Sequence, residues 1–140
     1  MFDQLVQFIS EKYPRAKKIV EVGVGHRIDI ARKVKENLPF TEVLVTDKDE
    51  YWVHQHKTGQ VRAVADDVMF PHLAIYGRPS LIYSIHPPVE LLPSLEELSW
   101  KVGADLLVVP ISDEQEAFQA EKWEKIIRTG RVVGWLLAKK

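Results

Sequence analysis

The chain has 140 residues, 46% of them hydrophobic, a length that supports one domain with one core but not two. A formal net charge of -1 gives no general attraction to nucleic acid or acidic membranes, and the lack of cysteine excludes disulfides and thiolate metal sites. No apolar run approaches the roughly 20 residues of a membrane span, and residues 1–15 do not resemble a signal peptide. We therefore expect a soluble, cytoplasmic protein with one domain over residues 1–140.

The first third of the chain predicts a helix, a strand and a second helix. Apolar residues recur at helical spacing in residues 1–13, and Pro14 ends that pattern. Residues 19–22 form a short apolar run rich in β-branched side chains, followed by Gly-Val-Gly at 23–25. Apolar residues then recur along one helix face from Ile28 to Leu38. Residues 19–38 therefore predict a strand, a tight glycine turn and a helix.

The glycine turn is the predicted centre of a ligand site. In a parallel α/β sheet such a turn lies at the carboxyl edge of the first strand, where the next helix offers unpaired N–H groups. Gly23 allows the sharp turn, and Gly25 leaves room where a side chain would collide with a ligand. We expect a nucleotide-type cofactor here. The alternative is a turn that serves only the path of the chain.

Carboxylates follow the next two predicted strands. Residues 42–47 predict a buried strand ending at Asp47, roughly 20 residues after the glycines, where dinucleotide-binding folds place the carboxylate that accepts hydrogen bonds from ribose. Residues 61–65 predict a third strand, followed by Asp66 and Asp67. At the same sheet edge, one of these either accepts from the exocyclic amine of a base or caps the segment after Val68.

A short helix or turn is predicted between these strands, at residues 48–57, and it contains His54 and His56. A zinc site needs further ligands, and neither the helical i, i+4 spacing nor a cysteine is present. We interpret both histidines as solvated residues of a surface segment and expect no metal.

The fourth predicted strand, residues 80–85, leads directly into His86-Pro87-Pro88. The two prolines fix two φ angles and force His86 away from helical geometry, which predicts a stiff shelf beside the cofactor cleft.

The rest of the chain predicts two helices and two strands. Residues 89–102 predict a helix ending at Gly103, and residues 105–109 and 131–138 predict the fifth and sixth strands. Between them, a capping box at residues 112–115 predicts a helix that stops at Gly130. The side chains expected to be buried by this helix are Phe118, Trp123 and Ile127.

The alternation of strands and helices predicts a three-layer Rossmann-like α/β domain. We expect a mostly parallel six-stranded sheet in the order 3-2-1-4-5-6, with helices on both faces and no seventh strand. In this order the direction of winding reverses between the first and fourth strands, so Gly23, Gly25 and His86 border one crevice.

The series VEVGVG, VTD, ADD and SIHPP resembles the successive cofactor motifs of Rossmann-like S-adenosylmethionine methyltransferases. Over nearly its full length, the chain more closely resembles a small family of short, uncharacterised archaeal proteins with this core and a YSI-x-PP-x-EL segment, here residues 83–91. The resemblance implies that the chain binds S-adenosylmethionine. The residues it assigns to the cofactor are Glu21, Gly23 and Gly25 in the first motif, Asp47 at the ribose, and Asp66 or Asp67 near adenine.

The SIHPP segment matches the fourth motif, where amine methyltransferases have Asn or Asp, two prolines and an aromatic residue. Here His86 replaces the amide or acid and Val89 replaces the aromatic, so the amine-accepting side chain and the stacking face are both missing. The resemblance places Ser84, His86, Pro87 and Pro88 in the substrate pocket.

Methyl transfer is an in-line displacement on an activated sulfonium, so alignment supplies much of the acceleration and a base only removes the acceptor's proton. His86 is the candidate catalytic base, because imidazole titrates near neutrality and this one lies at the predicted cleft. Its alternative role is a surface imidazole ahead of a structural Pro-Pro.

Two other classes of function stay open. Gly23, Gly25 and Asp47 also fit the fingerprint of an NAD-type dinucleotide-binding protein, although Ile28 stands at the place of the third glycine. The second class is a non-catalytic Rossmann module that acts through protein partners, which would present an apolar surface patch in place of an open cleft.

Overall fold

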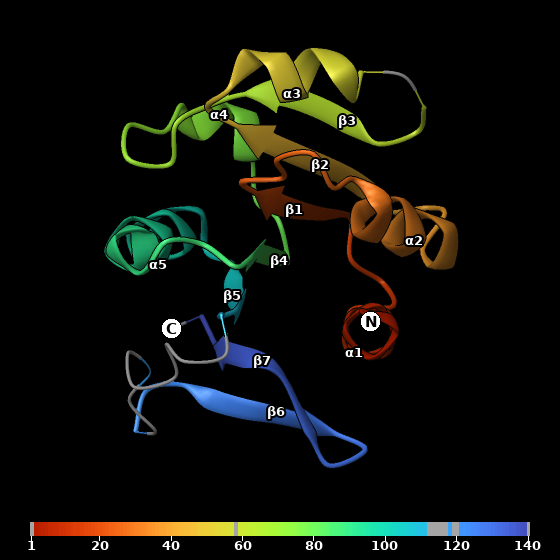
Figure 1. The fold of residues 1–140 in the computed structure, drawn as a ribbon, viewed down its shortest axis with the longest axis vertical. Coiled ribbons are helices and arrows are strands. Elements are labelled where there is room, and N and C mark those ends of the chain that lie inside the picture. The colour runs from red at the N-terminus through yellow and green to blue at the C-terminus, as the bar shows by residue number, and fades with distance from the viewer. Residues whose placement is uncertain (1, 58, 112–117, 119–120, 140) are drawn as a thin grey trace.

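In the computed structural model, which describes residues 2–57, 59–111, 118 and 121–139, a seven-stranded sheet has the order β3-β2-β1-β4-β5-β7-β6 (Figure 1). Five neighbouring strands are parallel, and β7 and β6 complete one edge as an antiparallel pair. The strands are β1 (Lys18–Val22), β2 (Glu42–Asp47), β3 (Arg62–Ala65), β4 (Leu81–Ile85), β5 (Asp105–Val109), β6 (Glu124–Arg128) and β7 (Arg131–Leu137).

Helices cover both faces of this sheet. Figure 1 shows α1 and α2 on one side and α5 on the other. The helices are α1 (Asp3–Lys12), α2 (Asp29–Asn37), α3 (Glu50–Gln55), α4 (Leu73–Tyr76), the 3-10 turn η1 (Val89–Leu91) and α5 (Leu92–Val102). Because side chains alternate along a strand, each strand contributes to two cores: Ile19 packs with the α1 and α2 side and Val20 with the α5 side. The predicted three-layer Rossmann-like class is confirmed.

The β1–β4 junction is the point where the winding reverses. β1 lies between β2 and β4, and Glu21 is paired in register with Tyr83. The chain winds outward from β1 to β3 and then returns to β4 on the other side of β1. A crevice therefore forms beyond the carboxyl ends of β1 and β4, as predicted.

The last quarter of the chain differs from the prediction. Residues 124–128 form β6 and not a helix, so the sheet has seven strands and is mixed, where six mostly parallel strands were expected. Ile126 is the buried residue, whereas Ile127 is 50% exposed, contrary to the predicted burial of Ile127. Pairing with β7 makes this segment a strand, because it supplies hydrogen-bond partners for the backbone N–H and C=O groups. The segment is too short to show strand alternation clearly in the sequence. Residues 112–117, 119 and 120 of the predicted helix, which include its capping box at 112–115, lie outside the described residues.

Two aromatic residues of that segment are buried as predicted, but they pack against β7. Phe118 stacks on Trp135 of β7 with ring centroids 5.3 Å apart, and Trp123 meets Phe118 edge-on at 4.9 Å. Both rings belong to the core on the α5 side.

The β6–β7 hairpin extends past the end of β5. Trp135 pairs with Val108, and β5 ends one residue later, so residues 131–133 continue beyond it. Thr129 and Gly130 form the two-residue turn, with φ of 50° and 76°. Positive φ at both positions is the geometry of a type I′ hairpin turn.

Candidate cofactor site

The glycine turn after β1 requires glycine at two positions. Gly23 has φ +76° and Gly25 has φ +57°, a region that other residues rarely adopt. The backbone N–H groups of Gly23 and Val24 both donate to the Thr46 carbonyl, at 2.8 and 3.1 Å. A Cβ at Gly25 would meet nothing within 4 Å, so open space lies on that side of the turn.

Asp47 ties this turn to the end of β2. Its Oδ2 accepts the Gly25 N–H at 2.8 Å, and its Oδ1 accepts the Asp49 N–H at 2.9 Å. Asp49 in turn caps α3 by accepting the Tyr51 N–H. A carboxylate has about four lone-pair positions, so Asp47 keeps acceptor capacity for a ligand while it holds the turn.

His56 holds the turn from the other side. Its Nε2 lies 2.7 Å from the Gly25 carbonyl, and because a carbonyl only accepts, Nε2 carries the proton. The ring is stacked on Trp52, and only 6% of the residue is exposed. The interpretation of His56 as a solvated surface residue is therefore wrong, whereas His54 is exposed. The i, i+4 spacing of Trp52 and His56, which places them on one helix face, was the signal in the sequence.

The carboxylate of Asp66 is already engaged in hydrogen bonds within the chain. This buried carboxylate accepts from the Nδ1 and backbone N–H of His72 and, at 2.5 Å, from the Tyr76 hydroxyl. Burial, with the hydrogen bond to Asp66 adding to it, raises the pKa of Tyr76 well above its ordinary value. The carboxylate of Asp67 accepts only the Met69 N–H, at 3.0 Å, among the described residues, so it has more free acceptor capacity than that of Asp66.

Glu21 is in β1, two residues before Gly23, and is 2% exposed. The Tyr83 hydroxyl donates to its Oε1 at 2.8 Å, across the β1–β4 pair. Burial raises the pKa of Glu21 to about 8, although the hydrogen bond from Tyr83 acts in the opposite direction. At neutral pH this carboxyl is therefore mostly protonated.

The shelf after β4 has an unusual backbone. His86 has φ +54°, and its N–H donates to the Val109 carbonyl at 2.7 Å. The side chain is exposed, with the Phe2 ring 6.0 Å away. Just before it, the Ser84 hydroxyl donates to the Val22 carbonyl at 2.9 Å, which connects the shelf to the end of β1.

A cavity of about 230 Å³ opens at this edge of the sheet. It brings together eight of the predicted site residues: Gly23, Asp47, Asp66, Asp67, Ser84, His86, Pro87 and Pro88. Glu21 and Gly25 do not line it. Its other lining residues, which sequence reasoning did not assign to the site, are Val22, Lys48, Val68, Met69, Ile85, Leu91 and Leu95. Leu91 and Leu95 carry helical spacing, which predicts core residues and gave no signal of a site.

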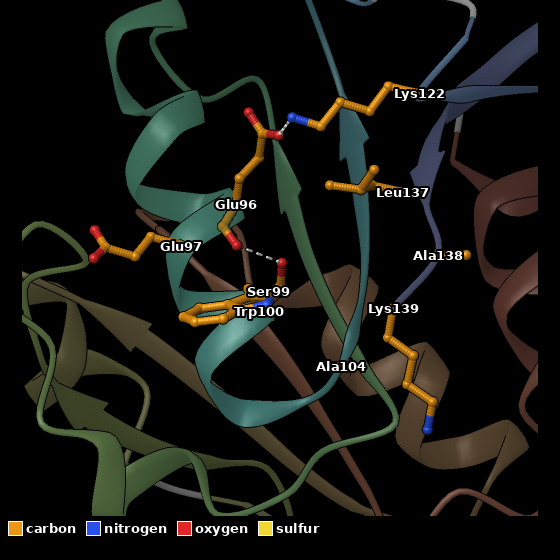
Figure 2. A pocket seen from close by; sticks show the side chains of 9 residues that line it. All are labelled: Glu96, Glu97, Ser99, Trp100, Ala104, Lys122, Leu137, Ala138 and Lys139. Carbon is orange, nitrogen blue, oxygen red and sulfur yellow. Dashed lines mark hydrogen bonds and ion pairs between the residues drawn. The ribbon is translucent and has the colours of Figure 1, made fainter.

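A second hollow, of about 270 Å³, lies at the opposite edge of the sheet, between α5 and the end of β7 (Figure 2). Polar groups there are paired within the chain: the Glu96 carboxylate with Lys122, and the Ser99 hydroxyl with the Glu96 carbonyl. In open parallel sheets ligands bind beyond the carboxyl ends of the strands, so this hollow is the weaker candidate.

Other kinds of site find little support in the part of the chain that the structure describes. No three His, Asp or Glu side chains converge there in a way that could hold a metal ion. Nor is any helix in those ranges both long and apolar enough to cross a membrane.

A glycine turn at the winding reversal of a seven-stranded mixed sheet, with carboxylates after the next two strands, defines a Rossmann-like fold of the kind that methyltransferases have. Solved structures share this fold at low sequence identity. The SAH-bound methyltransferase PaMTH1 of Podospora anserina matches with a TM-score of 0.67 at 10% identity, over 98% of this chain and 76% of that one. Human N-acetylserotonin methyltransferase in complex with SAM matches with a TM-score of 0.62 at 14% identity, over 98% of this chain and 55% of that one.

The chain belongs to the uncharacterised protein family UPF0146, whose model matches residues 1–133. A UPF0146 protein of Archaeoglobus fulgidus is 39% identical over 115 residues, which are 81% of this chain and 82% of that protein. The predicted membership of an archaeal family with a methyltransferase-type core is confirmed.

Proposed function

We propose that the chain binds S-adenosylmethionine in the cavity beyond β1, β2 and β4, and transfers its methyl group to an acceptor. The observation that carries this proposal is the convergence of the Gly23 turn, Asp47 and the His86 shelf on one open cavity. The neighbours of the same fold that hold SAM or SAH support the choice of cofactor.

The residues present suit the adenosine part of this cofactor. Gly23 and Gly25, whose positive φ favours glycine, have no side chains, so a ligand can approach the backbone closely at these two positions. Asp47 retains acceptor positions for the ribose hydroxyls, and Asp67 retains them for the adenine amine. Asp66 serves as the anchor of the segment after β3. The resemblance also assigned Glu21 to the cofactor; in our proposal it supports the turn from below.

The cavity size favours one nucleoside over a dinucleotide. Pockets for small molecules generally have about 300–1,000 Å³, and about 230 Å³ is just below that range. The Pro87-Pro88 shelf closes the cavity on the side of β4. NAD carries a second nucleoside and so needs more volume than this cavity has, which disfavours the dinucleotide alternative.

The bound cofactor would supply an activated methyl group, and the chain would align the acceptor with it. His86 lines the cavity with an exposed ring at the end of a stiff backbone, where it would remove the proton of the acceptor. Its N–H bond to Val109 and its contact with Phe2 hold the shelf in place.

Isothermal titration calorimetry with SAM, SAH and NAD tests the cofactor assignment. We expect saturable binding of SAM and SAH and none of NAD at the same concentrations. No heat with either SAM or SAH at millimolar ligand would contradict the proposal. Binding of NAD alone would instead support the dinucleotide-binding alternative.

A further inference from the structure

A larger groove of about 960 Å³ adjoins the candidate cofactor cavity, and His86 lines both. It lies between the start of α1, the end of β5 and the β6–β7 hairpin, whose turn is on the same side of the molecule as the N-terminus in Figure 1. Its apolar lining residues are Phe2, Leu5, Val109, Pro110, Ile111, Val132 and Val133, and its polar ones are Asp3, Gln4, His86, Arg128, Thr129 and Arg131.

Two arginines of this groove occupy opposed positions on the hairpin. Arg128 and Arg131 are the closing pair of β6 and β7. Like charges at directly opposed positions destabilise a sheet. Among the described residues neither forms a salt bridge, and the groove's carboxylate, Asp3, is paired with Lys33 at 3.3 Å. The Arg128 guanidinium also lies 5.1 Å from the Phe8 ring and donates to the Ile127 carbonyl at 2.9 Å, and neither contact neutralises its charge. An anion bound beside the two arginines would offset this repulsion.

The same groove contains both non-glycine residues with positive φ in the described ranges, His86 at 54° and Thr129 at 50°. Such conformations cost free energy, and they cluster at ligand sites where the surrounding structure over-determines them. The hairpin turn accounts for Thr129, whereas His86 follows a parallel strand and belongs to no hairpin. This conformation places His86 between the two cavities.

Charges at this edge of the sheet are segregated. The cofactor cavity carries Asp47, Asp66 and Asp67 against one lysine, Lys48, and so favours a cation. The groove carries two arginines against a paired aspartate and so favours an anion. Arg27, 5.3 Å from the Phe2 ring, adds positive charge beside it.

We propose that this groove is the acceptor site, and that it takes a small molecule with an apolar body and an anionic group, a phosphate or a carboxylate, held by Arg128 and Arg131. The inference rests on the proposed function, because it gives the acceptor of that same methyl transfer. The apolar body lies along Val132, Val133 and Phe2, and the accepting atom faces the cofactor cavity at His86. Two arginines on a chain of net charge -1 suit a single anionic group better than the repeated phosphates of a nucleic acid.

The test uses the full chain, with amide NMR shifts as the readout. Phenyl phosphate, phenylacetate and the neutral 2-phenylethanol are titrated in the presence of SAH. We expect at least one anion to shift the amides of residues 129–132, with little effect from the alcohol. Arg128→Gln and Arg131→Gln should each weaken that binding about tenfold or more. Arg62→Gln, on the far edge strand, is the matched control and should leave it unchanged.

Each outcome is decisive. Stronger binding of phenyl phosphate assigns a phosphate-bearing acceptor, and stronger binding of phenylacetate assigns a carboxylic acid; either supports the site. Equal binding of the alcohol, or no effect of both arginine substitutions, overturns it. So does a single-stranded RNA that shifts these amides when neither small anion does. If SAH shifts the amides of residues 23–25 but neither anion binds, only this inference fails. If SAH does not bind, the proposed function fails first.

Discussion

Glu21 is a buried carboxyl whose protonation is linked to folding. Its pKa is about 8 in the folded chain and near 4.5 when exposed, because burial disfavours the charged form. The contribution of this raised pKa to the free energy of unfolding is therefore fully present below about pH 4.5 and is lost as pH rises through about 8.

We predict that Glu21→Gln removes this dependence. The amide stays neutral and still accepts from Tyr83, so the variant should gain stability relative to wild type as pH rises from 5 to 9. Each pKa unit of difference corresponds to about 1.4 kcal/mol, so the gain is several kcal/mol at the upper end. Urea unfolding of both proteins at several pH values measures it. Parallel stability profiles would show that Glu21 ionises in the folded chain as it does in water.

Asp47 connects ligand binding to the shape of the turn, since one oxygen holds Gly25 and the carboxylate lines the cavity. Asp47→Ala should weaken SAH binding by more than the factor of about 5 that corresponds to 1 kcal/mol, the net value of an average hydrogen bond. Calorimetry gives the affinity. The control is Asp49→Ala, which removes a neighbouring carboxylate but keeps the bond to Gly25. An unchanged affinity in Asp47→Ala would mean that the ribose does not lie there.

At the scale of elements, the β6–β7 hairpin contains a strained turn. Thr129 is β-branched, and its φ of 50° lies in a region that such residues avoid. Asn-Gly is the preferred pair for this turn type, so Thr129→Asn should raise the free energy of unfolding by about 1 kcal/mol. Chemical denaturation checks the sign. Thr129→Val keeps the branched side chain and should bring no gain; a gain of equal size there would refute the conformational explanation.

The packing of β7 on β5 depends on a small residue. A Cβ at Gly134 would lie 3.0 Å from the Val108 carbonyl oxygen and 3.1 Å from a Leu107 methyl carbon. Gly134→Val should therefore destabilise the fold by about 1–3 kcal/mol, the usual cost of overpacking. Gly134→Ala should have a smaller effect. The thermal unfolding midpoints of the wild type, Gly134→Ala and Gly134→Val should fall in that order. Equal midpoints would show that β5 and β7 move apart at little cost in free energy.

At the scale of the whole molecule, the charge separation along the carboxyl edge has a measurable consequence. SAM carries one more positive charge than SAH, and the cavity lining has three carboxylates against one lysine. We expect SAM binding to weaken more steeply than SAH binding between 0.05 and 0.5 M NaCl, because salt screens this attraction over about 10 Å at 0.1 M. Calorimetry at several salt concentrations measures both slopes. Equal slopes would place the sulfonium away from the carboxylates.

The amino-acid sequence by itself determined the elements from α1 to β5 except the short helix α4, which no pattern predicted. It also determined the glycine turn at the winding reversal and the presence of Asp47, Asp66, Asp67 and His86 at one edge. These follow from local patterns: apolar periodicity sets the type of element, and parallel strands bring their carboxyl ends together. The predicted helix over residues 124–128 failed because that pattern was short and its partner, β7, lies beyond a turn.

Only the tertiary structure decided which of these side chains are free and which are already engaged. Asp66 binds Tyr76 and His72, and His56 is buried against Gly25. The pairing of Arg128 with Arg131 likewise depends on how one strand aligns with another. Hydrogen-bond partners and burial are set by residues distant in the chain, whereas periodicity reports only on neighbours within a few turns.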